Sequence, residues 1–160
     1  MALADQLSKI AQKIQPKINR ALKTDVANAV KDEEIKAIDD VVYGAYEPEV
    51  YERRAGSGGL GDPKNIKFSV ENGELSVWNS TKPNPGGVRN SHWVSVRKHL
   101  DELVEYGHGS MGGDYDFPRD GRAYMNPRPF TQKTIDNLNA NKNHVTALKE
   151  SLENQGFTIN

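Results

Sequence analysis

Residues 65–79 read NIKFSVENGELSVWN, and apolar and polar side chains alternate in them along two short runs. An alternation with period two is typical of a β-strand with one buried face. The residues between the runs, 71–74, read ENGE, and an Asn-Gly pair in this place is typical of a tight hairpin turn. The stretch therefore predicts a β-hairpin. It makes the fold class α+β, because the segments on either side have the periodicity of helices.

Helical periodicity precedes the hairpin. Apolar residues recur every three or four positions over 3–22, which predicts an amphipathic helix that Pro16 kinks or divides. A second helix is expected to start with Thr24 or Asp25 as its cap and to stop at Gly44. The charged residues of this helix are expected to form its solvated face; they are Lys31, Asp32, Glu33, Glu34 and Lys36.

Further elements are expected after the hairpin. Residues 92–96 predict another strand of a small twisted antiparallel sheet, and 98–106 predict a short helix. A C-terminal helix is expected over 131–156, ending at Gly156 and packed on the sheet. Long loops connect these elements, and a long loop in a small domain is usually functional or ordered by a partner.

The length and composition limit the function. The 160 residues suit a single domain, in which a helical part (1–44) precedes a loop (45–63), a sheet region with a short helix and a long loop (64–130), and the C-terminal helix (131–156). The 21 basic and 22 acidic residues give a net charge of −1, so no global field attracts nucleic acid or an anionic membrane.

Two further features of the composition narrow the class of protein. Cysteine is absent, which excludes disulfides, thiolate catalysis and the common zinc sites. The first residues contain acid and lysine and build no apolar run of signal-peptide or membrane length. We therefore expect a protein that is not exported by that route and that has no membrane partner.

Residues 55–63, AGSGGLGDP, contain the spelling G-x-G-x-x-G of a dinucleotide-binding turn. That turn needs a buried strand before it and a helix after it, whereas polar residues precede this one and a strand is predicted to follow. Asp62 and Pro63 also stand where a phosphate-binding P-loop has Lys and Ser or Thr. We predict a mobile or neighbour-ordered loop without a phosphate.

No motif for a metal or a cofactor is complete. Asp114, Asp116 and Asp120 resemble the start of a calcium loop that lacks its later oxygen ligands. The four histidines lack the spacing of a helical metal site, and His108 alone lies in a glycine-flanked loop. We expect no catalytic residue, metal or cofactor.

Two alternative functions stay open. One is a small hydrolase or nuclease that uses His108 with Asp114 or Asp116. The other is a nucleic-acid-binding module that uses the basic residues in the middle of the chain, namely Arg53, Arg54, Lys64, Arg89, Arg97, Lys98, Arg119, Arg122 and Arg128.

Residues 103–107, LVEYG, are followed after a long loop by Arg128-Pro129-Phe130 and an amphipathic terminal helix. This order resembles the neck or tail-completion proteins of long-tailed bacteriophages, also called head-tail joining proteins. Their upstream Tyr-x-Pro and Tyr-x-Arg-Thr-Gly-x-Leu motifs match 46–48 and 51–56, with Leu60 in place of the last leucine. The chain departs from the pattern at Ala55, where the family has Thr, and in the length of the loop before Arg128.

The resemblance implies a structural protein of the virion rather than an enzyme. Such a subunit assembles in the host cytoplasm into a ring, sixfold in the family, at the neck or at the head-proximal end of the tail tube. The ring joins the tail tube to the head-side connector, and DNA passes through it without sequence-specific binding. The resemblance leaves open whether the ring is a tail terminator, a collar or a stopper-side subunit.

The residues expected to contact neighbouring subunits lie in and around these motifs. They are Tyr46, Pro48, Tyr51, Arg53, Arg54, Glu105, Tyr106, Tyr115, Phe117, Arg128, Pro129 and Phe130. Aromatic residues and arginine are the types enriched in interface hot spots. The prolines at 127 and 129 are also expected to hold the approach to the last helix extended, with Phe130 docking that helix on the sheet.

Overall fold

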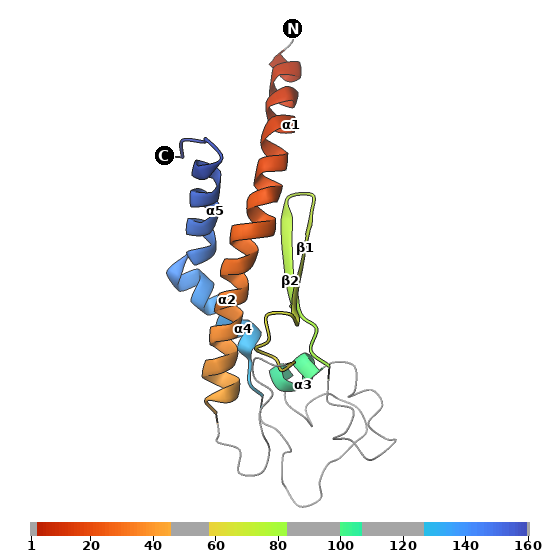
Figure 1. The fold of residues 1–160 in the computed structure, drawn as a ribbon, viewed down its shortest axis with the longest axis vertical. Helices are drawn as coiled ribbons and strands as arrows, with labels where there is room; N and C mark the ends of the chain where they lie inside the picture. Colours follow the sequence, from red (N-terminus) through yellow and green to blue (C-terminus); the bar gives the residue numbers. More distant parts are fainter. Residues whose placement is uncertain (1–2, 46–57, 83–99, 107–126, 160) are drawn as a thin grey trace, which may run out of the picture.

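The structure is a computed structural model that describes residues 3–45, 58–82, 100–106 and 127–159. Within these ranges, helices occupy both ends of the chain and a hairpin lies between them (Figure 1). The predicted α+β class is therefore confirmed. The predicted strand at 92–96 lies outside the described residues. None of the helices in these ranges is both long enough and apolar enough to cross a membrane.

One long N-terminal helix replaces the two predicted ones. Helix α1 (Leu3–Ala21) continues through a π-helical turn, η1 (Leu22–Val26), into α2 (Ala27–Ile38), and it ends with a second π-helical turn, η2 (Asp39–Tyr43). Pro16 lies inside α1 without ending it.

The predicted cap at Thr24 or Asp25 is wrong. The Thr24 hydroxyl donates to the carbonyl of Arg20 at 3.0 Å, a bond that Thr makes inside a continuing helix. Ala21, Leu22 and Val26 are buried, so the apolar stripe runs through the predicted boundary and its packing keeps the helix continuous.

The hairpin is as predicted. Strand β1 (Ile66–Glu71) pairs antiparallel with β2 (Glu74–Asn79), with Ile66 opposite Asn79 and Glu71 opposite Glu74. The two turn residues have positive φ values, 52° at Asn72 and 81° at Gly73, as a type I′ turn requires. The inner face carries Phe68, Val70, Leu75 and Val77 and packs on η1 and α2.

The predicted C-terminal helix is divided into α4 (Phe130–Asn141) and α5 (Asn143–Asn154). Lys142 separates them because its φ of 55° is left-handed and ends the first helix. Helix α4 packs mainly on α2, and α5 packs on η1, α1 and α2. The expected packing on the sheet is thus corrected, because the one apolar face of the hairpin is already used by the long helix (Figure 1).

One cluster of the hydrophobic core lies at the C-terminal end of the long helix. Phe130 is only 2% exposed, and the buried residues packed around it are Ala37, Ile38, Val42, Leu60 and Val104. Val104 belongs to the short helix α3 (Leu100–Tyr106), which confirms the helix predicted there. The cluster contains no strand residue, so Phe130 docks α4 on the long helix and not on the sheet.

Truncating Phe130 tests the position of the core. Phe130→Ala should lower the free energy of unfolding by about 3–5 kcal/mol, because it leaves a cavity among buried side chains. Urea unfolding measures this loss. Ile135→Ala on the same helix is the control, since Ile135 is 45% exposed, and it should change stability by no more than about 0.5 kcal/mol. Equal losses in the two variants would contradict this core.

Candidate functional site at the helix junction

The two motifs of the C-terminal half meet in space. The backbone N–H of Arg128 donates to the carbonyl of Val104 at 2.9 Å, which joins the approach to α4 to helix α3. Val104 and Phe130 are both buried in the same cluster. We call this unit, Val104, Glu105, Arg128, Pro129 and Phe130, the helix junction.

Glu105 caps helix α4 from the neighbouring helix. Its carboxylate accepts hydrogen bonds from the backbone N–H of Thr131 at 2.9 Å and of Gln132 at 3.4 Å. The first N–H groups of a helix have no partner within the helix, and the positive end of the helix dipole favours an anion there. Pro129 at the N-cap makes no side-chain cap, so Glu105 supplies the missing acceptor. The predicted helix-entry role of the Pro-Arg-Pro-Phe segment is consistent with this geometry.

Arg128 connects the junction to the long helix. Its Nη1 donates to the carbonyl of Val42 at 3.5 Å, at the end of η2. The last carbonyls of a helix also lack partners, and a cation is favourable there. Through its backbone and its guanidinium, Arg128 therefore ties α3, α4 and the end of the long helix together.

A buried polar network lies at the base of the hairpin, beside the junction. Asn79 Nδ2 donates to Glu34 Oε1 and to the carbonyl of Leu60, each at 3.0 Å. The Thr81 hydroxyl donates to Asn79 Oδ1 at 2.6 Å. Burial raises the pKa of Glu34, and the nearby Asp101 and Glu105 add to this effect. The network joins the hairpin, the glycine-rich loop and α2.

The neighbouring Glu33 is buried in a different setting. It accepts from Lys36 Nζ at 2.7 Å and from Asn143 Nδ2 at 2.8 Å, so it holds the start of α5. The hydrogen bond from Lys36 lowers the pKa of Glu33. Glu33 and Glu34 are 3% and 7% exposed, so their predicted place on a solvated face is wrong.

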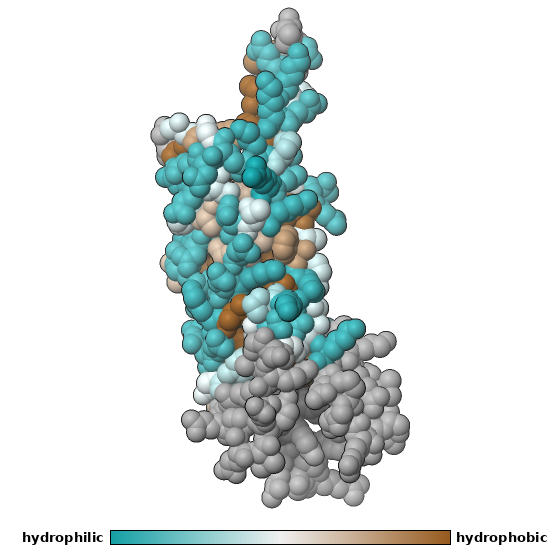
Figure 2. All heavy atoms as spheres, in the orientation of Figure 1, coloured by the Kyte–Doolittle hydropathy of each residue, from teal (hydrophilic) through white to brown (hydrophobic). Residues whose placement is uncertain are grey.

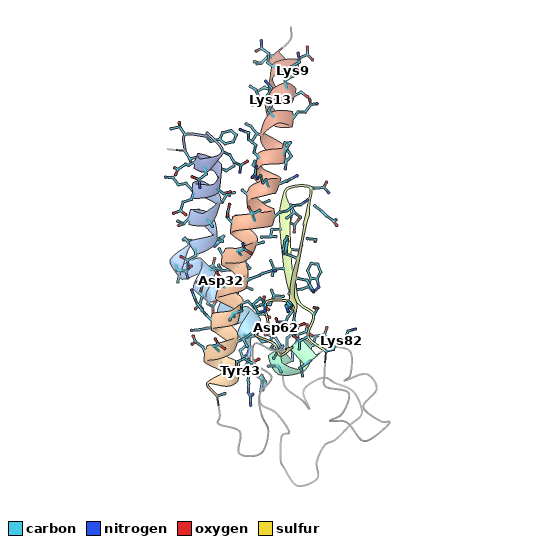
Figure 3. The ribbon with its side chains drawn as sticks, in the orientation of Figure 1. Lys9, Lys13, Asp32, Tyr43, Asp62 and Lys82 are labelled. Atoms are coloured by element: carbon cyan, nitrogen blue, oxygen red, sulfur yellow. The ribbon has the colours of Figure 1, made fainter. Side chains whose placement is uncertain are left out.

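Asp62 organises the described part of the glycine-rich loop (Figure 3). Its carboxylate accepts from the backbone N–H of Lys64 at 2.9 Å and of Gly58 at 2.7 Å, and these bonds lower its pKa. The Gly61 N–H donates to the Tyr43 hydroxyl at 3.2 Å, and Leu60 is buried. Residues 58–63 are therefore ordered by their own chain, which corrects the predicted mobile or neighbour-ordered loop; 55–57 lie outside the described residues.

The structure places part of the predicted contact set. Glu105, Arg128, Pro129 and Phe130 form the helix junction, and Tyr106 beside them is 57% exposed. Phe130 is buried, so it serves the core of its own subunit. The other predicted contacts lie outside the described residues; they are Tyr46, Pro48, Tyr51, Arg53, Arg54, Tyr115 and Phe117.

The predicted alternatives for catalysis fall outside the described ranges as well. His108, Asp114 and Asp116 belong to a segment that the structure does not describe. Within 3–45, 58–82, 100–106 and 127–159, no group of three or more His, Asp or Glu side chains is placed to hold a metal ion. In the described ranges, the side chains of the helix junction link α3, α4 and the end of the long helix.

A family model named YomN matches residues 6–154, which is nearly the whole chain. The chain therefore belongs to the YomN family, and it is a phage-related protein. Comparison with curated proteins gave no match, and comparison with solved structures gave none either.

Removing the cap tests the helix junction. Glu105→Ala should lower the free energy of unfolding by about 1 kcal/mol, the usual cost of a lost N-cap acceptor. Glu150→Ala on the exposed surface of α5 is the control and should leave stability nearly unchanged. Hydrogen exchange should show faster exchange at Thr131 and Gln132 in the first variant only. Unchanged exchange there would contradict the cap.

The two buried glutamates predict opposite pH effects. The pKa of Glu34 is raised above 4.5 in the folded protein, so protonated Glu34 stabilises the fold. This contribution is lost as pH rises through the folded pKa, because the buried side chain then ionises. Glu34→Gln keeps the acceptor for Asn79 and should be more stable than wild type near neutral pH, with no difference below pH 4.5. The pKa of Glu33 is lowered, so Glu33→Gln should be less stable near neutral pH, with the difference lost as pH falls through the folded pKa.

Urea unfolding of the three proteins across the acid range measures both effects. Each variant is the other's control, because the residues are neighbours on one helix. A loss of stability near neutral pH in both variants would contradict the raised pKa of Glu34.

Proposed function

We propose that this protein is a structural virion protein of the phage neck or tail-completion type. In this proposal it assembles as a ring that joins the tail tube to the head-side connector, and it has no catalytic role. The observation that carries the proposal is the helix junction. Two short motifs that resemble the neck proteins, whose described residues are Val-Glu-Tyr (104–106) and Arg-Pro-Phe (128–130), are far apart in the sequence. They nevertheless form one unit through Arg128, Val104 and Glu105.

The helix junction gives a physical reason for the residue types in the two motifs. Glu105 is needed as an acceptor for α4, Phe130 as a core anchor, and Arg128 as a link to the long helix. A ring subunit transmits force between a head and a tail, and a junction that fixes three helical elements suits that task. Membership of a phage-related family supports the same proposal.

Tyr106 is the described residue best suited to touch a neighbouring protein from this junction. It follows Glu105 directly at the end of α3 and is 57% exposed. Tyrosine supplies a large apolar surface and a hydroxyl, and it is enriched in interface hot spots. An exposed tyrosine next to a rigid junction therefore fits an assembly contact.

A Tyr106 substitution tests the proposed function. Tyr106→Ser should leave the melting temperature close to that of wild type but strongly reduce the joining of tails to heads. Joining is measured by electron microscopy after the purified protein is added to tails and heads made without it. Val145→Ser, at an exposed position of α5, is the matched control and should join normally.

Other outcomes would contradict the proposal. Wild-type protein that binds neither heads nor tails would count against a neck role. A metal-dependent nuclease activity lost in His108→Ala would favour the hydrolase alternative instead. Tight DNA binding that weakens steeply with salt would favour the nucleic-acid-binding alternative.

A further inference from the structure

The first turns of α1 carry an apolar stripe that the described chain leaves exposed. Leu3, Leu7 and Ile10 are 73%, 58% and 53% exposed, and their spacing puts them on one side of the helix. They form a brown column on the projecting helix (Figure 2). We call these residues, together with the half-buried Ile14, the α1 seam.

The α1 seam lies beyond the rest of the described molecule. A Cβ at Gly73, in the hairpin turn, would lie 2.9 Å from Gln15 Nε2, so the hairpin turn reaches α1 near Gln15. The helix before that residue projects past both the hairpin and α5 (Figure 1). This part of α1 continues a helix that packs on η1 and α5 further along, and covering its exposed apolar side chains would remove them from water.

The charges beside the seam are positive. Lys9 and Lys13 are four residues apart on the projecting helix (Figure 3). Their spacing from the seam residues puts both of them on one flank of the seam. Ala4 and Ala11 lie along the other flank, where their small side chains allow close approach. Across α1 and η1, two acidic residues, Asp5 and Asp25, stand against five basic ones, which are Lys9, Lys13, Lys17, Arg20 and Lys23.

The outer face of the hairpin has the complementary character. The pairing of Lys67 with Trp78, Ser69 with Ser76 and Glu71 with Glu74 puts these six residues on the face opposite to the buried one. Trp78 is 46% exposed, and the two glutamates next to the turn are exposed. This face therefore offers an aromatic surface at one end and paired carboxylates at the other.

We propose that the α1 seam of one copy of this chain lies across the outer hairpin face of a neighbouring copy. Leu7 and Ile10 contact Trp78, and Lys13 lies toward the carboxylates of Glu71 and Glu74. This inference rests on the proposed ring function and names the contact that would build the ring. A copy cannot make the contact within itself, because its seam projects past its own hairpin, whose outer face points away from the helix.

The contact uses two different surfaces, so it is heterologous. Such a contact passes from each copy to the next and closes into a ring when the rotation allows it. A stable interface buries about 1,600 Å² in total, and three helical turns against one hairpin face supply only part of that area. In a closed ring, each copy makes the contact twice, once through its seam and once through its hairpin. Closure of the ring therefore strengthens the assembly beyond a single contact.

Cross-linking between two cysteine variants tests the contact, because the chain has no cysteine of its own. Ala11→Cys, beside the seam, is mixed with tagged Ser76→Cys on the outer hairpin face, and disulfide formation is followed at high protein concentration. The disulfide between the Ala11→Cys and Ser76→Cys chains is expected to outweigh the disulfides that each variant forms with itself. Gln12→Cys, on the opposite side of α1, is the matched control and should give little product with Ser76→Cys.

Charge reversal adds a second readout. Lys13→Glu in the Ala11→Cys partner should reduce the mixed product several-fold, and Glu74→Lys in the Ser76→Cys partner should restore it. Restoration requires direct complementarity of the two charges, which a general loss of folding would not give. The melting temperature of each variant shows whether it is folded.

Several outcomes would overturn the proposed contact. If Ala11→Cys linked mainly to itself, two α1 seams would pair with each other. If the protein bound anionic vesicles through the seam and gave no cross-link, the seam would bind a membrane surface instead. The same samples are viewed by electron microscopy and mixed with tails. If rings form and join tails but the Ala11–Ser76 link is not found, the proposed contact is wrong and the neck function stands. If the link forms but the protein never joins tails, the neck function is wrong.

Discussion

The packing of Phe130 between α3 and the end of the long helix is the interaction on which the arrangement of this fold depends. Helix α4 begins at a proline that cannot cap it with a side chain, so its first N–H groups need an acceptor from elsewhere. Glu105 supplies it from α3, and the Arg128–Val104 backbone bond holds the two segments in register. Phe130 then enters the core next to the end of the long helix.

A second constraint comes from the burial of charge on α2. Glu33 and Glu34 are neighbours in sequence, yet one faces Lys36 and Asn143 and the other faces Asn79. Ionisation is favoured at the first, because Lys36 donates a hydrogen bond to it, and disfavoured at the second, because burial penalises its charged form. The two carboxylates fix α5 and the hairpin on different sides of the same helix.

The sequence predicted some of these elements because their signals are local. The Asn-Gly pair and the alternating runs determine the hairpin and its turn by themselves. The fold class follows from the hairpin together with the helical periodicity on either side of it. The helix-entry role of Pro129 and Phe130 was also predictable, since proline restricts the backbone before and at its own position.

Other features depend on distant partners and had no local signal. Pro16 and Thr24 indicate a helix boundary, but buried Ala21, Leu22 and Val26 pack through it and keep the helix continuous. The left-handed Lys142 divides the last helix although lysine has no preference for that conformation. Burial of Glu34 and the turn built on Asp62 depend on contacts far along the chain, with Asn79 and Tyr43.

In the proposed function, the chain forms a ring at the junction of tail and head. The measurement that tests it most directly is native mass spectrometry of the protein recovered with tail tubes, together with images of the same tubes. The expected result is a closed ring of identical copies at the head-proximal end of the tube. A protein that stays monomeric and is recovered with neither heads nor tails would contradict it.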